Sequence, residues 1–334
     1  MTTMRILADV LFRNNDTVLL DCVHDWFFVD VTTKKIDSRV ANCHFQAFDS
    51  DLSIAYCLRK GVPVLLQLDD LSSEDFKILG PEQIIVEMRL GATKEYLHFG
   101  ALDRRGGNSI GVIRTSNMSL VNHWHLENDE YFGSIRNTFF GDCFLTSIDE
   151  NPRGGTKLRS TVDGSLVFDF TLDCIPVGHL DRYLRPQQNE NFSALEILLC
   201  NYNGSVFSRQ VRDEFLWYVS ASPTGKFYAT GSRGGWSIHS SVDGSIICEG
   251  DGRSDIFFAN SNDIAIRLFG GGMNQRYEVL QIEDNKSMLL DGGKTGGLFS
   301  NVVLSSDSST LVFYSKMHHF TADIPEFRIV SVKL

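Results

Sequence analysis

The sequence is poor in the features that mark membrane-spanning, secreted and disordered proteins. No apolar stretch reaches the roughly 20 residues that a transmembrane helix needs. The apolar run near the start follows a single basic residue and is too short for a signal sequence. Only 7 prolines occur in 334 residues, and no low-complexity linker is present, so long disordered tails are not expected. These absences predict a cytoplasmic protein.

The cysteines contain no Cys-x-x-Cys pair. There are 7, an odd number, scattered over positions 22, 43, 57, 143, 174, 200 and 248. This pattern argues against both a disulfide framework and a zinc site. We therefore predict reduced thiols in the core and no metal or other cofactor.

The stretch from residue 215 to 249 divides into four short antiparallel strands, here called a, b, c and d. Strands are predicted at 215–220, 226–232, 236–242 and 245–249. Between them lie turn residues: SPTG at 222–225, RGG at 233–235 and the Asp243-Gly244 pair. Proline presets φ and glycine accepts positive φ, and an Asp-Gly pair favours a tight hairpin. This segment predicts one four-stranded sheet.

The Asp-Gly-Ser turn recurs with a fixed period. Similar five-residue segments begin at Asp163, Asn203 and Asp243, 40 residues apart each time. A period near 40 with four strands in each unit is typical of the blades of a β-propeller. Propellers of this length are single domains, so the repeat predicts one all-β domain over residues 1–334.

The same segment resembles the WD40-like propeller family. Its SPTGK at 222–226 followed by FYATGS at 227–232 is similar to that family's turn into strand b, and residues 304–315 and 48–57 carry weaker copies. The Trp-Asp dipeptide is absent, with Val29-Asp30 and Leu68-Asp69 in comparable places. The resemblance covers the architecture and implies no particular subfamily.

Paired b and c strands give the number of blades. Eight pairs are expected: 17–22 with 26–31, 53–58 with 64–68, 96–102 with 109–114, 143–148 with 157–162, 194–201 with 205–211, 226–232 with 236–242, 264–269 with 277–282, and 310–315 with 327–332. The fifth follows a polar run with Pro186, so residues 181–192 are interpreted as an inserted loop or helical turn. The prediction is a propeller of seven or eight blades, with the count favouring eight.

The last unit ends after strand c. We expect N-terminal residues 4–10 to supply its missing partner, because an unclosed propeller would expose sheet edges able to pair with other chains.

Several short motifs suggest chemistry that their context does not support. Residues 107–111 fit Gly-x-Ser-x-Gly but lie in a predicted hairpin rather than a strand-to-helix turn. Residues 292–295, GGKT, lack the first glycine of a phosphate-binding loop. His123 and His125 share one face of a predicted strand without a third metal ligand, and the turn at 251–255 has too few oxygen ligands for calcium.

Charge is distributed unevenly over the predicted loops. In WD40-like propellers the b–c and d–a loops share one face, and the a–b and c–d turns share the other. The b–c loops carry basic residues, of which the candidate binding residues are Arg59, Arg105, Arg153, Arg233, Arg276, His318 and His319. The opposite turns carry mainly aspartates. A basic ring of this kind would attract carboxylates or phosphates; the alternative is that these are solvated side chains beside tight glycine turns.

These patterns favour a non-catalytic module that holds a protein partner on one face, such as an inhibitor or immunity protein that blocks an enzyme or toxin. The net charge of −11 argues against general nucleic-acid binding, and no membrane contact is expected. The alternative is a propeller hydrolase, lyase or lactonase acting on an anionic small molecule in the central channel. For that reading the loop residues of interest are His24, Asp25, His318, His319 and Asp323.

Overall fold

A computed structural model describes most of the chain. The described residues are 5–7, 9–22, 25–41, 43–48, 53–90, 94–104, 106–126, 130–131, 143–148, 156–160, 164–170, 175–176, 182–188, 195–201, 205–212, 216–222, 224–259, 263–271, 274–283, 286–315, 318–320 and 327–332. They form β-strands and turns without an α-helix. In this part of the chain no helix has the length and apolar character needed to cross a membrane.

The chain divides into two compact units. The first comprises Met1–Arg39 and Ile175–Leu334, and the second comprises Val40–Cys174. The second unit is thus inserted, in sequence, between two parts of the first. The two units are described separately below.

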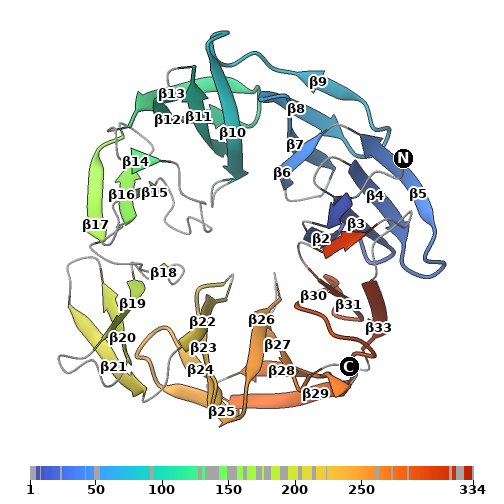
Figure 1. Cartoon of the computed structure of the whole chain (residues 1–334), viewed down its shortest axis with the longest axis vertical. Helices are drawn as coiled ribbons and strands as arrows, with labels where there is room; N and C mark the ends of the chain where they lie inside the picture. The colour runs from blue at the N-terminus through green and yellow to red at the C-terminus, as the bar shows by residue number, and fades with distance from the viewer. Residues whose placement is uncertain are drawn as a thin grey trace. The chain divides into compact units, whose positions relative to one another are not determined.

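The second unit contains three antiparallel sheets, each with four strands in chain order (Figure 1). They are β6 (His44–Phe48), β7 (Ile54–Arg59), β8 (Val62–Gln67) and β9 (Ser73–Asp75); β10 (Gln83–Leu90), β11 (Tyr96–Asp103), β12 (Asn108–Arg114) and β13 (Ser119–His125); and β14 (Glu130–Tyr131), β15 (Cys143–Ile148), β16 (Thr156–Ser160) and β17 (Leu166–Phe170).

The first unit contains four more sheets of four strands. They are β2 (Asp9–Phe12), β3 (Thr17–Cys22), β4 (Asp25–Asp30) and β5 (Ile36–Ala41); β18 (Ile175–Pro176), β19 (Arg182–Gln188), β20 (Leu195–Asn201) and β21 (Val206–Arg212); β22 (Leu216–Ala221), β23 (Phe227–Ser232), β24 (Gly235–Ser240) and β25 (Ile246–Asp251); and β26 (Ser254–Phe258), β27 (Ile264–Phe269), β28 (Arg276–Glu283) and β29 (Lys286–Lys294). Strand β5 leads into the second unit.

Two smaller sheets complete the first unit. The strands β30 (Asn301–Leu304), β31 (Thr310–Tyr314) and β33 (Phe327–Ser331) form a sheet of three, and β1 (Arg5–Leu7) pairs with β32 (His318–Phe320). Seven four-stranded sheets and one of three strands among the described residues agree with the prediction of seven or eight blades.

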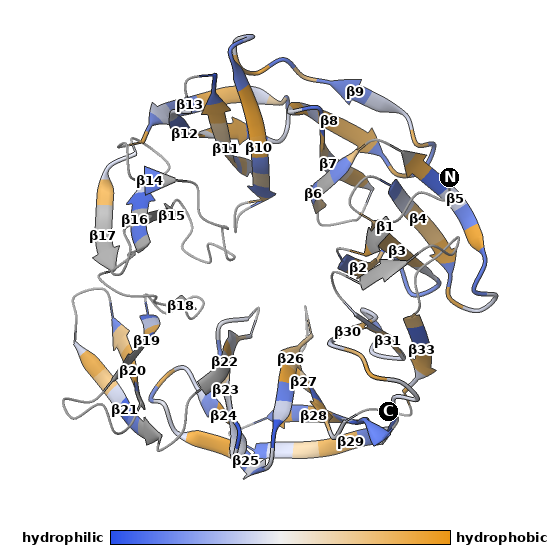
Figure 2. Cartoon of the chain, in the orientation of Figure 1, coloured by the Kyte–Doolittle hydropathy of each residue, from blue (hydrophilic) through white to orange (hydrophobic). Residues whose placement is uncertain are grey.

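Burial explains why these segments become strands. Every residue of β23 and β31 is buried, whereas the edge strand β9 is exposed along its whole length. The same contrast is visible within one sheet in Figure 2, where β8 carries apolar segments and β9 hydrophilic ones. Apolar clusters lie between neighbouring sheets: residues of β27, β28 and β31 share one cluster in the first unit, and residues of β7, β10 and β11 share another in the second. The interior strands therefore supply the core.

The predicted four-strand segment is confirmed. Strands β22 to β25 pair in chain order, and β24 pairs with β25 across the Asp243-Gly244 turn. Gly164 and Gly244 both have positive φ, +72° and +76°, and both lie in the turn between the third and fourth strands of a sheet. The repeated Asp-Gly-Ser segments therefore mark c–d turns.

The interpretation of the fifth pair was wrong. Strand β20 is followed by β21, but these are the third and fourth strands of their sheet rather than b and c. Residues 182–188 form the second strand, β19, so this part of the expected 181–192 inserted loop is a strand. Pro186 misled the prediction because proline cannot donate a ladder hydrogen bond. Pro186 nevertheless lies opposite Ile197 in the register that pairs β19 with β20 along its whole length.

The expected contact between the two ends of the first unit is present in a different form. Residues 5–7 pair with 318–320, and Leu7 and Val10 share a buried cluster with Val312 and Tyr314. The hydroxyl of Tyr314 also donates to Asp9. The N-terminal segment therefore joins β32, whereas we had expected it to become the fourth strand beside β33.

Candidate binding surface

One edge of the first unit gathers exposed basic side chains. Arg233 lies in the hairpin between β23 and β24, and Arg253 lies in the loop between β25 and β26. The N–H of Gly252 donates to the carbonyl of Gly234 at 2.8 Å, which holds these two loops against each other. The b–c and d–a loops of this sheet thus meet at one end.

The next sheet adds two more cations. Arg276 begins β28 and lies directly opposite Lys294 at the end of β29, and both side chains are exposed. Like charges placed opposite each other in a sheet are mildly unfavourable until an anion lies between them. We call the set Arg233, Arg253, Arg276 and Lys294 the Arg233 edge.

The Arg233 edge also carries acidic side chains. Asp251 is exposed, and Asp255 is half-buried. Burial raises the pKa of Asp255, and the charge of Arg253 lowers it in part. Arginine can bind a carboxylate through two parallel hydrogen bonds, so this edge is suited to a carboxylate-bearing partner.

Sequence reasoning proposed Arg233 and Arg276 as binding residues and did not propose Arg253 or Lys294. The prediction counted charges in b–c loops alone. Residues just after strand d, such as Arg253, belong to the same end of the sheet and would have been found by including the d–a loops.

Arg59, in the second unit, is already engaged within its own sheet. Its guanidinium donates to the carboxylate of Asp75 at 3.1 Å, to the hydroxyl of Ser73 at 3.3 Å and to the sulfur of Cys43 at 3.4 Å. These contacts tie the end of β7 to the edge strand β9. Arg59 therefore has a local partner for each end of its guanidinium.

The remaining predicted binding residues lie outside the described side chains. Arg105 and Arg153 fall outside the described residues, and for His318 and His319 only their place in β32 is described. The proposed basic set stays a prediction at these four positions.

The aspartates of the opposite turns have structural partners. Asp243 accepts from the N–H and hydroxyl of Ser245 at 3.0 and 2.7 Å, and Asp307 accepts from Ser305 and Ser309 in the same way. These hydrogen bonds hold the pKa of both carboxyl groups below the usual value, the Ser245 N–H being the main cause for Asp243 and the Ser305 hydroxyl for Asp307. The carboxylates therefore shape turns.

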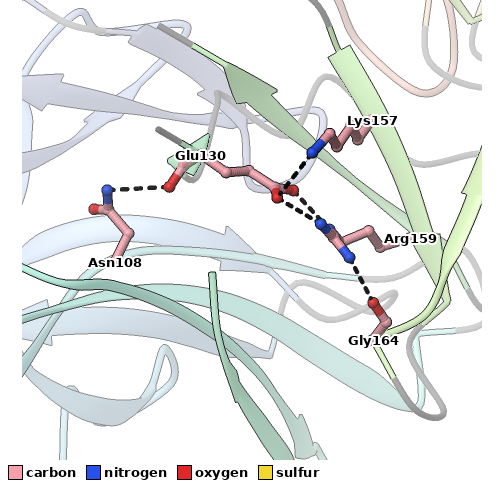
Figure 3. A network of polar contacts seen from close by, with 5 residues as sticks. All are labelled: Asn108, Glu130, Lys157, Arg159 and Gly164. Carbon is pink, nitrogen blue, oxygen red and sulfur yellow. Dashed lines mark hydrogen bonds and ion pairs between the residues drawn. The ribbon is translucent and has the colours of Figure 1, made fainter. Parts of the chain in front are cut away.

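A buried ionic network lies in the second unit (Figure 3). The carboxylate of Glu130 is 1% exposed and receives two hydrogen bonds from Arg159, at 2.6 and 2.5 Å, with the ammonium of Lys157 at 3.6 Å. Arg159 also donates to the carbonyl of Gly164, and Asn108 donates to the carbonyl of Glu130. The network joins β16 and β14 to the neighbouring strand β12. Its carboxylate is occupied by cations, so we assign it a structural role.

A neutral network in the first unit performs the same connection without charge. His239 is fully buried, and its Nε2 lies 2.7 Å from the hydroxyl of Ser237. Its Nδ1 lies 2.9 Å from the amide nitrogen of Gln210, which also donates to the hydroxyl of Tyr228. An amide nitrogen can only donate, so a His239 Nδ1 that accepts from it leaves the ring proton on Nε2. Gln210 on β21 thereby joins the sheet that contains β23 and β24.

The motifs set aside in the sequence occupy ordinary strand positions. Ser109 is buried near the start of β12, and Gly292 to Lys294 end β29. His123 lies 3.0 Å from the hydroxyl of Ser109 and stacks on Phe99. Burial, with a smaller contribution from His125, lowers the pKa of His123. Among the described residues, no three His, Cys, Asp or Glu side chains are grouped to hold a metal ion.

The residues considered for a catalytic site are not brought together in the described part of the chain. Asp25 forms an ion pair with Arg39 at 2.7 Å. His24 and Asp323 lie outside the described residues.

Comparison with protein families and with curated protein sequences gives no match. Solved structures do match. Sqt1 from Saccharomyces cerevisiae has a TM-score of 0.59 at 10% identity, covering 99% of this chain and 96% of Sqt1. A eukaryotic initiation factor has a TM-score of 0.53 at 9% identity, with coverages of 97% and 90%. Hydrazine synthase from Kuenenia stuttgartiensis has a TM-score of 0.51 at 13% identity, with coverages of 96% and 94%.

These similarities establish the fold class. The neighbours include WD40 β-propellers, Sqt1 among them, and the four-stranded antiparallel sheets are the blades of such a fold. The chain is therefore an all-β protein of the β-propeller class, as the 40-residue repeat predicted. Identities of 9–13% carry the fold and no activity.

Proposed function

We propose that this chain is a non-catalytic protein-binding β-propeller that holds an acidic partner at the Arg233 edge. Propellers present loops from a rigid scaffold, and binding residues are disproportionately carried by such loops. The observation that carries the proposal is the joining of the β23–β24 hairpin to the β25–β26 loop, which places Arg233 and Arg253 in two adjoining loops. The pairing of Arg276 with Lys294 extends the same basic set.

The acidic turns give weaker support for a basic partner. Asp243 and Asp307 already accept hydrogen bonds that shape their turns. A partner cation would compete with those donors, whereas the four side chains of the Arg233 edge are exposed. We therefore favour the basic edge over the acidic turns.

In its narrower form, the proposal is that the bound partner is an enzyme or toxin whose activity is blocked, so that the chain acts as an inhibitor or immunity protein in the cytoplasm. The test is the activity of the purified partner with and without stoichiometric propeller. A complex that leaves the partner fully active would reject the inhibitor form and retain the binding module.

The binding proposal is tested by pull-down with two variants of equal charge change. The first is Arg233→Glu with Arg276→Glu. The matched control is Lys35→Glu with Lys286→Glu, which alters two exposed lysines at c–d turns of the same unit. Both variants are first checked for wild-type folding by circular dichroism and thermal unfolding.

The expected result is a partner retained by the wild type and the control but lost by the Arg233 and Arg276 variant. Retention should also weaken as salt rises, because exposed charge interactions are screened. Equal retention by both variants, or loss only in the lysine control, would contradict the proposal.

A further inference from the structure

Two buried thiols and an arginine meet at the first two strands, β6 and β7, of the first sheet of the second unit. Cys43 lies one residue before β6, and its side chain is 0% exposed. Cys57, on the adjacent strand β7 and paired with Phe45, is also 0% exposed; its thiol donates to the carbonyl of Ala55 at 3.6 Å and interacts with the side chain of Cys43. Arg59, two residues further along β7, donates to the same sulfur at 3.4 Å. We call Cys43, Cys57, Arg59, Ser73 and Asp75 the Cys43 cluster.

The charges around Cys43 favour its ionised form. The groups that face it are Cys57 and Arg59 on β7 and Asp75 on β9. The side-chain interaction with Cys57 is the largest influence and the hydrogen bond from Arg59 adds to it, while burial and Asp75 oppose them; together they lower the pKa of Cys43 to about 6. Burial raises the pKa of Cys200 and of Cys248 instead. Cys43 is therefore chemically different from the other core thiols.

The strand that anchors the Arg59 guanidinium beside Cys43 is weakly paired. Strand β9 has three residues, all exposed, and pairs with β8 at three positions. Its Ser73 and Asp75 are the groups that hold the Arg59 guanidinium in place. Short, exposed edge segments open locally at much lower free energy than a core strand. Such an opening would admit a small molecule to a sulfur that is closed in the resting structure.

We propose that Cys43 and Cys57 form a hydroperoxide-sensitive dithiol that closes to a disulfide, with Cys43 as the attacking sulfur. The Cys43 thiolate attacks one peroxide oxygen, so that an S–O bond forms and the O–O bond breaks, and the departing hydroxide takes up a proton to become water. Cys43 is oxidised by two electrons to sulfenic acid while the peroxide is reduced. The sulfur of Cys57 then attacks the sulfur of Cys43, forming the S–S bond, and the sulfenic hydroxyl leaves with the proton of Cys57 as a second water.

Arg59 has a positioning role in this chemistry. Its hydrogen bond stabilises the thiolate before attack, and that bond is lost once the sulfur is in a disulfide. Oxidation would therefore release Arg59 from Cys43 while leaving Ser73 and Asp75 as its partners.

The experiment measures the reaction of each thiol in the folded wild-type protein. A short iodoacetamide pulse at pH 6 is followed by peptide mass spectrometry, and Cys43 is compared with Cys200. At this pH a thiol of pKa about 6 is half ionised, whereas Cys200, whose pKa burial raises above 9.0, is ionised to less than about 0.1%. The lower intrinsic nucleophilicity of the more acidic thiolate reduces this advantage about 20-fold. The expected excess of Cys43 alkylation is at least about 25-fold.

The second arm uses hydrogen peroxide. Wild-type protein should yield a Cys43–Cys57 disulfide-linked peptide that dithiothreitol removes. The Cys57→Ser variant should accumulate sulfenic acid at Cys43, trapped by dimedone. Arg59→Gln should slow Cys43 oxidation at pH 6 and shift its pH profile upward, and Arg59→Lys should restore part of the rate, which a purely structural arginine would not do.

Cys43 alkylation no faster than that of Cys200, or peroxide-treated wild type without the linked peptide, would overturn the proposal. If Cys57→Ser or Arg59→Gln does not fold, the disulfide-linked peptide and the pH profile of the wild-type protein still test the proposal. The binding assay with the Arg233 edge variants is independent of both readouts.

Discussion

The networks around Glu130 and His239 both connect neighbouring sheets, the first through charged groups and the second through neutral ones. In the second unit, a buried carboxylate with two cations joins β14 and β16 to β12. In the first unit, Gln210 joins β21 to β23 and β24 through neutral groups. Both lie between neighbouring four-stranded sheets.

The two networks should differ in how much stability the protein loses when one side chain of the network is replaced. A buried ion pair stabilises a protein little compared with apolar residues in its place, because two charges must be removed from water. A buried ion left without its counterion is strongly destabilising. A neutral donor or acceptor left unpaired costs about 1–3 kcal/mol. Replacing one member should therefore lower the free energy of unfolding more in the ionic network than in the neutral one.

The largest effect is expected for Glu130→Gln. The change leaves two partly buried cations without a counterion and should lower the free energy of unfolding by about 3–5 kcal/mol, measured by urea denaturation at pH 7. The matched control is Glu82→Gln, whose ion pair with Arg104 is exposed and should contribute less than about 1 kcal/mol.

Replacing all three charges would sharpen this result. A Glu130→Met, Lys157→Met, Arg159→Met variant should regain much of the stability lost by Glu130→Gln, because no buried charge remains unpaired. If Glu130→Gln is no more harmful than Glu82→Gln, the network has no special role.

A smaller effect is expected for Gln210→Leu in the neutral network. The change removes the amide N–H groups, which can serve two of the three nearby acceptors on Tyr228, His239 and Gly244, and should cost about 1–3 kcal/mol. The same urea titration measures it. A loss equal to that of Glu130→Gln would remove the distinction between the two networks.

The equivalent c–d turns of the two units provide the next test. At Gly244 a Cβ would lie 2.3 Å from the hydroxyl oxygen of Ser208, and at Gly164 it would lie 2.8 Å from the ring of Trp124; both glycines have positive φ. Each change to alanine should cost about 1–3 kcal/mol. Gly80→Ala is the control, because its Cβ meets nothing within 4 Å and its φ is not in the positive region. If Gly80→Ala lowers the melting temperature as much as the other two changes do, the role given to Gly164 and Gly244 in these turns is contradicted.

The smallest effect concerns pH. The pKa of Asp243 is lower in the folded chain than its ordinary value of 3.8, mainly because of the hydrogen bond from the Ser245 N–H. Its stabilising contribution is therefore complete above the unfolded pKa and is lost as the pH falls through the folded pKa. Asp243→Asn should lower the melting temperature slightly at pH 6, and the difference from wild type should shrink as the pH falls below 3.8 towards the lower pKa of the folded state. A melting-temperature difference that grows as the pH falls would contradict this expected pH dependence.

Much of the fold could be predicted from local sequence. Turn residues and alternation located the four strands between residues 215 and 251, since tight turns have specific residue requirements. The same rules failed at β19, where a polar run with Pro186 is a strand because it pairs along its whole length with β20. That circumstance depends on the neighbouring strand and leaves no mark in the segment itself.

The polar sites were less predictable. Arg233 and Arg276 were found because loop position follows from strand order. Glu130 and Arg159 are 29 residues apart, and Cys43 and Arg59 are 16 apart, with no motif in either pair. Their contacts arise from how strands align, which composition and spacing do not encode.

The discontinuous first unit has a consequence for synthesis on the ribosome. Asp9 and Tyr314, which are hydrogen-bonded, are 305 residues apart. At translation rates of about 5–20 residues per second, the N-terminal strands would wait roughly 15–60 s for their partners to be made. Residues 40–174, which form a contiguous unit, can assemble on the nascent chain during that interval. The earliest strands would therefore be the ones that most need protection by chaperones, and their docking would be a late step in folding.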